Sequence, residues 1–268
     1  MQFSTLDGNH NLKPINKVQM DISVLITVKN DRDSIPRLME SLRTFSGLFE
    51  IVVVDAYSTD GTYEYLEDIR EKMGLILSRK AGKRSVGRNE CIRLSSGSKL
   101  VFLDSDTEVS RNWGEILMRD MGRDIVAGRI IQESVKKWAD LNRVPMYFEG
   151  TDVTFPSNNL MYSRKVIEKI GTFDENFNTA EDIDLNIRAV KAGFKIFYDE
   201  ELVVFHRPRL SFSSLMKQSY YDGVGRRLIR KKHGLRSSLN FSNLKKHPFI
   251  ESSRLVSGII GYAFGGFE

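Results

Sequence analysis

The chain has 268 residues, enough for one large α/β domain with an appendage. Hydrophobic residues make up 41% and charged residues 28% of the chain, which excludes a mainly disordered protein. The single cysteine, Cys91, excludes an internal disulfide and a cysteine zinc cluster. One cysteine is typical of a protein in a reducing compartment, so we expect a cytoplasmic location.

Positive charge is concentrated near the C-terminus. Residues 207–254 contain twelve Lys/Arg and two acids, a net charge of +10, which leaves about −5 for the rest of a +5 chain. Such a block favours phosphates, nucleic acid or an anionic membrane surface, although a solvated basic face has the same composition. No nucleic-acid-binding motif accompanies the block, so we expect no nucleic-acid partner.

The two ends of the chain differ in character. Residues 1–20 are polar, lack the apolar segment of a signal peptide and are predicted to be a leader. Leu255–Phe267 is apolar and glycine-rich but shorter than the ~18–20 residues that span a bilayer. It fits either a helix lying in a membrane interface or the start of an anchor. With the basic block, it predicts attachment to an anionic membrane at its cytoplasmic face, by binding that falls with salt.

Strands and helices alternate along the first half of the chain. Runs of branched apolar residues predict buried strands, and the amphipathic segments between them predict helices. The predicted strands are 22–28, 50–54, 75–77 and 99–103, and the predicted helices are 34–45, 58–72 and 85–94. This alternation predicts a Rossmann-like, mostly parallel sheet flanked by helices on both faces.

The second half is less regular. Predicted strands are 124–133, 158–163, 195–198 and 202–206, and predicted helices are 111–121, 164–170, 181–192 and a basic helix at 215–232. Residues 137–148 are ambiguous between helix and strand. We therefore expect one α/β domain over 21–210 and a basic, helical C-terminal extension over 211–268.

Polar residues follow three of the predicted strands. They are Thr27 to Asn30, Asp55 to Asp60, and Asp104 to Asp106. Because ligands bind beyond the carboxyl ends of parallel strands, we expect these residues to form a single site.

Two common nucleotide-binding signatures are absent. The glycines of residues 82–88 have P-loop spacing, but Arg88-Asn89 replaces the required Lys-Ser/Thr. Gly223-Val224-Gly225 lacks a third glycine and follows no strand. A Walker ATPase and a Rossmann dehydrogenase are therefore excluded.

Two carboxylates and one imidazole at the ends of predicted strands suit metal binding. Asp104 and Asp106 end a buried strand, where two carboxylates can hold Mg²⁺ or Mn²⁺ together with substrate phosphates. A capped turn would have the same residues. His206 closes another predicted strand and is a candidate third ligand, although a lone histidine is more often structural.

A second acidic group opens the helix predicted at 181–192. Thr179 with Asp182 reads as a capping box, in which the acid only stabilises the helix. Capping needs one acid, however, and Glu181, Asp182 and Asp184 crowd this turn. Clustered carboxylates raise one another's pKa, which suits a general base.

Six segments occur in an order that resembles a known family. They are residues 24–30, the run IVVVDAYSTDGT at 51–62, GRN at 87–89, VFLDSD at 101–106, GTFDE at 171–175 and EDIDL at 181–185. Over about residues 21–210 the chain resembles family 2 glycosyltransferases, which have the GT-A fold. The resemblance implies an inverting, metal-dependent transfer of a sugar from a nucleotide-diphospho-sugar.

The resemblance also implies roles for individual residues. Thr27, Asn30 and Asp55 would hold the nucleoside, and Arg84 and Arg88 would approach the nucleotide. Asp104 and Asp106 would form the DXD motif, with Asp104 serving both nucleotide and metal and His206 as a further metal ligand. Asp182 would be the catalytic base, with Glu181 orienting the base or the acceptor.

Two departures from the family pattern affect the donor. Ala56 stands where many members have a second acid, and Lys29 where many have an aromatic residue. We expect a UDP-sugar, with GDP-mannose as the alternative and with Mn²⁺ or Mg²⁺ as cofactor. The expected acceptor is a hydroxyl or phosphate of a membrane-associated molecule, such as a lipid-linked glycan or a polyprenyl phosphate. The alternatives are a soluble or polysaccharide acceptor, or a non-catalytic nucleotide-sugar binder.

Overall fold

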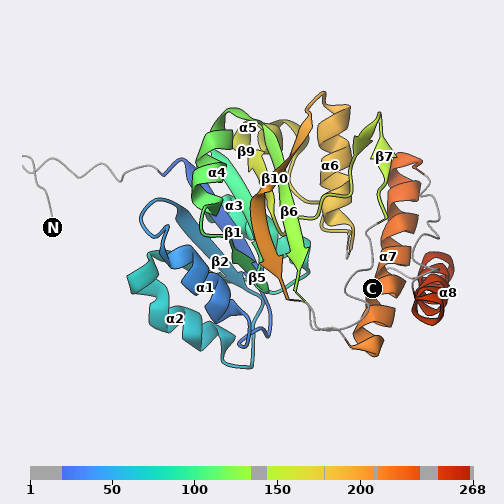
Figure 1. Ribbon diagram of the computed structural model, residues 1–268, viewed down its shortest axis with the longest axis horizontal. Helices are drawn as coiled ribbons and strands as arrows, with labels where there is room; N and C mark the ends of the chain where they lie inside the picture. The colour runs from blue at the N-terminus through green and yellow to red at the C-terminus, as the bar shows by residue number, and fades with distance from the viewer. Residues whose placement is uncertain (1–19, 134–143, 178, 208–210, 236–246, 266–268) are drawn as a thin grey trace, which may run out of the picture.

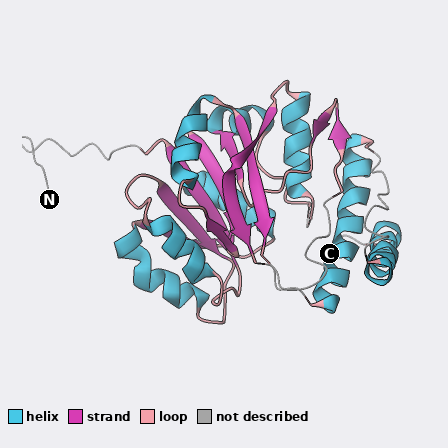
Figure 2. Cartoon of the chain, viewed as in Figure 1, coloured by secondary structure: helices cyan, strands magenta, loops and turns pink. Residues whose placement is uncertain are grey.

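A twisted central sheet with helices on both faces forms the body of the molecule (Figures 1 and 2). The computed structural model describes residues 20–133, 144–177, 179–207, 211–235 and 247–265. Within these residues the sheet has eight strands in the order β3-β2-β1-β4-β9-β6-β10-β5. The predicted leader lies outside the described residues except for Met20.

The first half of the chain folds as its sequence predicts. Its elements are β1 (Ile22–Val28), α1 (Ile35–Arg43), β2 (Glu50–Asp55), α2 (Thr62–Met73), β3 (Leu75–Arg79), α3 (Arg84–Leu94) and β4 (Lys99–Asp104). β1 pairs in parallel with both β2 and β4, and β2 pairs in parallel with β3. The strands are apolar on both sides because helices cover both faces of the sheet.

The second half completes the sheet with strands of both directions. Its elements are β5 (Thr107–Val109), α4 (Trp113–Arg119), a 3₁₀ turn (Asp120–Gly122), β6 (Ile125–Gln132), β9 (Leu160–Ser163), α5 (Arg164–Ile170), α6 (Glu181–Lys191) and β10 (Ile196–His206). β9 runs antiparallel between β4 and β6, and β5 runs antiparallel to β10. A short hairpin, β7 (Tyr147–Phe148) and β8 (Thr151–Asp152), uses part of the ambiguous segment, whose residues 137–143 lie outside the described residues.

One predicted pair of strands is a single strand. β10 continues through the polar residues Asp199, Glu200 and Glu201, and its register against β6 shifts between Asp199 and Val203. Such a bulge bends a strand without ending it. The carboxylates stay on the strand because Arg119 of α4 pairs with both Asp199 and Glu201.

Two apolar layers enclose the sheet. On one face, α1, α2 and α4 pack on the sheet around Leu38, Leu66 and Trp113. On the other face, α3, α5 and α6 pack around Cys91, Val166 and Leu185. These layers fix α3 and α6 against the same face of the sheet, which decides the geometry of the site.

The C-terminal helix pair consists of α7 (Phe212–His233) and α8 (Pro248–Phe264). α7 packs against α6 through Ile229, and α8 lies on the outer side of α7 (Figure 1). A Cβ atom added at Gly223 would lie 1.9 Å from the carbonyl oxygen of Gly258, so the two backbones touch there. None of the helices among the described residues is long and apolar enough to cross a membrane.

Candidate active site

The strand register brings the predicted polar residues to one edge of the sheet. Thr27 lies opposite Asp104, and Val28 lies opposite Asp55. The ends of β1, β2 and β4 therefore share one level, as the sequence predicts. Thr27 also packs against α3, where a Cβ atom added at Gly87 would lie 2.9 Å from its Cγ2 atom.

Asp55 is a buried carboxylate with one unsatisfied oxygen. Its Oδ2 atom accepts hydrogen bonds from Ser58 N at 3.0 Å and from Arg79 Nε at 3.3 Å. Its Oδ1 atom is buried and has no hydrogen-bond partner. A buried acceptor without a donor is costly, so this oxygen is suited to a donor group on a ligand.

Asn30 joins the loops that follow β1 and β2. Its backbone N–H donates to Ser58 Oγ and its side-chain oxygen accepts from Thr59 N, both at 2.8 Å. Its left-handed backbone, with φ of 51°, is one that asparagine tolerates. Asn30 therefore shapes the loops beside Asp55.

Arg88 connects the sheet to α6. The side chain is 4% exposed, and its Nη1 atom donates to Glu181 Oε1 at 2.5 Å while Nη2 donates to Asp104 Oδ1 at 3.0 Å. Arg84, one turn earlier in α3, lies in the same field, and the negative charge of Asp104 raises the pKa of its guanidinium. Contact of both arginines with the nucleotide stays a prediction, and Arg88 already binds two carboxylates.

The DXD carboxylates have different partners. Burial alone would raise the pKa of Asp104, but the positive charges of Arg88 and Arg84 outweigh it and hold that pKa below its ordinary value. Asp106 Oδ2 lies 3.1 Å from Nε2 of His206, whose Nδ1 atom lies 2.9 Å from Gln132 Oε1. Burial lowers the pKa of His206, but its hydrogen bond with Asp106 outweighs burial, and the net shift is upward.

The residues fit a metal only in part. Among the described residues no group of three or more His, Cys, Asp or Glu side chains is arranged to hold a metal ion. Asp106 and His206 are within hydrogen-bond distance, and their oxygen and nitrogen atoms suit Mn²⁺. Asp104 faces Arg88 instead. The donor set therefore fits a cation held by two side chains, with phosphate oxygens and water completing its coordination.

Asp182 opens α6 beside Glu181. Its Oδ1 atom accepts from Ile183 N at 2.8 Å and its Oδ2 atom from Ser157 N at 3.3 Å. Burial, and then the negative charge of Glu181, raises the pKa of Asp182 to about 6. The capping-box interpretation is wrong, because the N-cap is Ala180 in a left-handed conformation, whose side chain makes no capping hydrogen bond.

Sequence reasoning missed two polar groups beside Asp182. Ser157 Oγ and Asn158 Oδ1 are buried and have no hydrogen-bond partner. The backbone N–H of Ser157 donates to Asp182, so Ser157 lies next to the predicted base and Asn158 is the residue that follows it. Sugar hydroxyls are ligands that could satisfy such atoms. Only the folded arrangement shows them, because Ser and Asn before a strand are typical of any loop.

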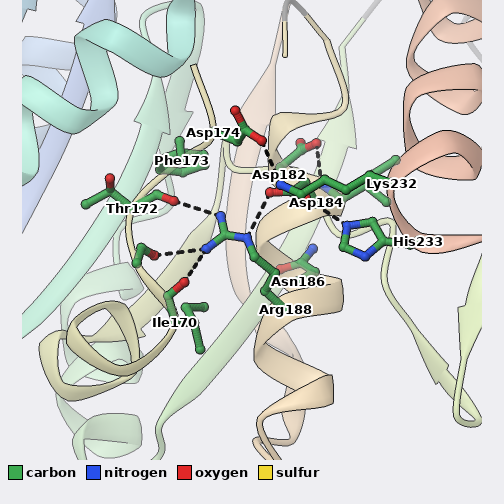
Figure 3. Close-up of polar contacts among 12 residues, drawn as sticks. Ile170, Thr172, Phe173, Asp174, Asp182, Asp184, Asn186, Arg188, Lys232 and His233 are labelled. Carbon is green, nitrogen blue, oxygen red and sulfur yellow. Dashed lines mark hydrogen bonds and ion pairs between the residues drawn. The ribbon is translucent and has the colours of Figure 1, made fainter. Parts of the chain in front are cut away.

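A polar network ties α6 to α7 (Figure 3). Asp184 is fully buried, and its carboxylate is bound by Arg188 Nε at 2.9 Å, Lys232 Nζ at 2.7 Å and His233 Nε2 at 2.8 Å. Arg188 also donates to the carbonyl oxygens of Ile170 and Thr172. The network therefore fixes α6 to α7 and to the loop after α5.

The network also determines the protonation and tautomer of His233. Lys191 Nζ lies 3.1 Å from Nδ1 of His233 and can only donate, so Nδ1 accepts and the ring proton lies on Nε2. That proton is donated to Asp184. Burial lowers the pKa of His233, which favours this neutral ring.

Comparison with known proteins identifies the family. Residues 23–184 match the profile of "Glycosyl transferase family 2". The chain belongs to this family of glycosyltransferases, as its motifs predict.

Two curated relatives illustrate the similarity. The pre-mycofactocin glycosyltransferase of Mycobacterium tuberculosis is 26% identical over 231 residues, covering 80% of this chain but 48% of that protein. The chain thus spans about half the length of that relative. A dolichyl N-acetyl-alpha-D-glucosaminyl phosphate 3-beta-D-2,3-diacetamido-2,3-dideoxy-beta-D-glucuronosyltransferase of Methanococcus voltae is 24% identical over 238 residues, covering 79% and 74% of the two chains.

Two solved structures have the same fold. Staphylococcus aureus TarS in complex with UDP-GlcNAc superposes with a TM-score of 0.59 at 17% identity, covering 91% of this chain and 82% of that one. The mannosyltransferase PcManGT of Pyrobaculum calidifontis, in complex with GDP-Man and Mn²⁺, gives 0.61 at 16% identity, covering 92% and 76%. The predicted GT-A fold is therefore confirmed.

The buried network makes a prediction about stability. Asp184→Ala should lower the free energy of unfolding by about 2–3 kcal/mol, because it removes the buried carboxylate that Arg188 and Lys232 bind and leaves the N–H donor of His233 without its acceptor. The exposed pair Arg43–Glu40 provides the control, and Glu40→Ala should barely change stability. Urea unfolding of the two variants measures both values.

The stability difference between wild type and Asp184→Ala should depend on pH, and the pKa of Asp184 gives the direction. Burial would raise the pKa of Asp184, but hydrogen bonds from Lys232 and His233 outweigh it, so the folded-state pKa is depressed. The stabilisation is therefore present above the unfolded-state pKa of about 3.9 and is lost as pH falls through the folded-state pKa. The difference between wild type and Asp184→Ala should shrink below about pH 4. A constant difference down to pH 2 would contradict this role of the Asp184 charge.

Proposed function

We propose that the protein transfers a sugar, with inversion, from a nucleotide-diphospho-sugar to an acceptor hydroxyl or phosphate, with Asp182 as general base. One observation carries the proposal: Arg88 holds Glu181, and with it Asp182, beside Asp104 at the edge of the sheet where β1, β2 and β4 end. A base with a raised pKa thus lies next to a candidate diphosphate site.

The donor would lie along the ends of β1, β2 and β4. Asp55 supports a nucleoside contact because its Oδ1 atom is buried without a partner. Arg79 binds the other oxygen of the same carboxylate, Oδ2, and leaves Oδ1 for the nucleobase. Thr27 and Asn30 shape the same pocket, and Arg84 and Arg88 offer positive charge to the diphosphate.

We favour a UDP-sugar, with a GDP-sugar as the alternative. The similar TarS and PcManGT structures contain UDP-GlcNAc and GDP-Man respectively, so fold similarity supports either base.

A divalent cation would be held by Asp106 and His206, with Asp104 close to the ribose and the diphosphate. Bound Mn²⁺ or Mg²⁺ would neutralise the charge that develops on the leaving diphosphate. The chain itself supplies Arg84 to the same end, because its guanidinium lies in the field of Asp104 and Asp106.

Asp182 would accept the proton of the acceptor oxygen as that oxygen attacks the anomeric carbon. The proton moves from the hydroxyl to a carboxylate oxygen of Asp182, and the glycosidic bond forms as the bond to the diphosphate breaks. Ser157 and Asn158 would bind sugar hydroxyls beside this carboxylate. One carboxylate is enough, because inversion needs no glycosyl-enzyme intermediate.

The proposed acceptor is a lipid-linked molecule at the cytoplasmic face of a membrane. The Methanococcus relative is named for a dolichyl phosphate-linked sugar, which supports this class. The surface of α8 also supports it, because a stripe of apolar side chains along that helix is exposed. These side chains are Phe249, Val256, Ile259, Ile260 and Phe264.

The basic residues of α7 contribute less than their number indicates. Lys232 pairs with Asp174 and Asp184, Arg227 donates to the carbonyl oxygens of Ala263 and Gly265, and Arg230 donates to the hydroxyl of Tyr262. The apolar stripe of α8 is therefore the main candidate for membrane contact. A soluble or polysaccharide acceptor would need no such stripe, and a non-catalytic binder would need no base with a raised pKa.

The pH dependence of turnover tests the role of Asp182. Because a base must be deprotonated, kcat/KM should rise with pH through an inflection near 6 and level off above pH 7.

Asp182→Asn should lower turnover by about 10²-fold or more while nucleotide affinity persists. Glu181→Gln should shift the inflection to lower pH, because it removes a charge that raises the pKa of Asp182. If Glu181→Gln is inactive and Asp182→Asn is active, the roles of the two residues are reversed.

Donor turnover tests the metal. Release of nucleoside diphosphate from a panel of UDP- and GDP-sugars should require Mn²⁺ or Mg²⁺ and should stop in excess EDTA.

Substitutions test the two proposed metal ligands. Asp106→Ala should abolish turnover, and His206→Ala should weaken Mn²⁺ binding without lowering the melting temperature greatly. The matched control is Glu108→Ala, since Glu108 faces Arg207 at 3.7 Å and should be dispensable. Full activity in EDTA would refute metal dependence.

Vesicle sedimentation tests the membrane surface. The protein should bind vesicles that contain anionic lipid, and Val256→Glu with Ile260→Glu should weaken that binding at least tenfold by placing charge on the apolar stripe. Leu48→Glu changes an equally exposed apolar residue near α1 and should bind as wild type does. Equal binding by the double variant, or self-association of the wild type without lipid that the same substitutions abolish, would contradict a membrane role for α8.

A further inference from the structure

Tyr57 has a backbone conformation that a bulky residue rarely adopts. Its φ angle is 56°, in the left-handed region, where a Cβ atom crowds the following carbonyl oxygen. Among the described residues, the other non-glycine residues with positive φ are Asn30, Ala180 and Glu149. Asn30 and Ala180 also border the candidate active site, so the strained positions gather there.

Packing of the ring does not explain the strain at Tyr57. Tyr57 is 54% exposed, so the fold leaves about half of its surface open to solvent. Glycine would satisfy the same loop geometry without strain. We therefore attribute the aromatic ring at this position to contact with a ligand and not to a contribution to folding stability.

The surroundings of the ring indicate the chemistry of that ligand. The Arg79 guanidinium carbon lies 5.3 Å from the centre of the Tyr57 ring and 3.8 Å from that of Tyr63. Arg79 Nε also lies 3.3 Å from Asp55 Oδ2. Arg79 thus links the Tyr57 ring to the carboxylate of Asp55, whose Oδ1 atom has no donor. A flat face beside a hydrogen-bond acceptor matches a flat heteroaromatic ring that carries an N–H group.

We propose that Tyr57 is the stacking surface for the nucleobase of the donor, and that its backbone strain is retained for this contact. The proposal rests on the proposed function, because it requires that a nucleotide binds at Asp55. Lys29, which follows the neighbouring strand β1, offers no aromatic face, and Tyr57, which is more than half exposed, offers a ring on the loop after Asp55. Stacking tolerates any base, since every base has a π face, and Tyr57 therefore adds affinity for UDP and GDP alike.

The test separates binding from stability. Calorimetry with UDP and with GDP, each with Mn²⁺, is carried out on wild type, Tyr57→Gly and Tyr57→Phe. Tyr57→Gly should weaken both nucleotides by about tenfold or more, the usual effect of losing a base-stacking ring. Tyr57→Phe keeps the ring and should bind as wild type does. Pyrophosphate, which has no base, should bind all three proteins equally.

Thermal unfolding provides the second measurement. The melting temperature of Tyr57→Gly should not fall and should rise if relief of strain outweighs the flexibility of glycine. Glu149→Gly is the matched control: Glu149 has φ of 47° in the exposed β7–β8 turn, so its replacement relieves similar strain without changing nucleotide affinity. A purely structural Tyr57 would instead give a lower melting temperature with unchanged affinity for UDP and GDP.

The outcomes distinguish this inference from the proposed function. If wild type binds neither UDP nor GDP, the proposed function fails. If wild type binds a nucleotide and Tyr57→Gly binds it equally well, only the role of Tyr57 fails. Equal losses for nucleotide and pyrophosphate would also overturn stacking, because they would show that the substitution disturbs the diphosphate site.

Discussion

The buried guanidinium of Arg88 is the constraint on which the candidate site depends. A charge in the interior is tolerated only when it is paired and hydrogen-bonded, and Arg88 meets this condition with carboxylates from two distant parts of the chain. Asp104 ends β4 and Glu181 begins α6. Arg88 therefore sets the separation between the edge of the sheet, where a donor would bind, and the helix that carries the candidate base.

Three acids open α6, and their surroundings give them different properties. Glu181 is paired with Arg88, and Asp184 is paired with Arg188 and Lys232 and accepts a hydrogen bond from His233. Asp182 lies between them and receives backbone N–H groups from Ile183 and Ser157. Burial and the charge of Glu181 then raise its pKa, whereas the pKa of Asp184 is lowered. Different environments thus distinguish the two ion-paired acids, Glu181 and Asp184, from Asp182, the candidate base.

The sequence predicts those features that follow from local pattern. Buried strands such as 22–28 are recognised because their apolar runs are continuous, and the parallel register then brings Thr27, Asp55 and Asp104 together. The antiparallel strand β9 between β4 and β6 is not predictable in this way, since strand order depends on long-range packing. The same limit explains why β10 reads as two strands: the pairing of Arg119 with Asp199 and Glu201 is invisible in a local window.

Partners of charged side chains are equally hidden. The run of Arg and Lys near the end of α7 reads as a basic patch, yet Lys232 neutralises Asp184 inside the protein. The left-handed Ala180 that precedes α6 has no sequence signature, because alanine rarely adopts that conformation. The unsatisfied atoms of Asp55, Ser157 and Asn158 likewise emerge only once burial is known.

A double-mutant cycle between Arg88 and Glu181 tests the central claim most directly. Unfolding free energies are measured for wild type, Arg88→Met, Glu181→Gln and the double variant. Arg88→Met leaves the buried carboxylate of Glu181 without its cation, whereas Glu181→Gln removes one of the two carboxylates that Arg88 binds and leaves Asp104 as its partner. The double variant should therefore be destabilised by about 1 kcal/mol or more less than the sum of the single effects. Additive effects, with a coupling energy near zero, would show that Arg88 does not hold α6 to the sheet and would contradict the account.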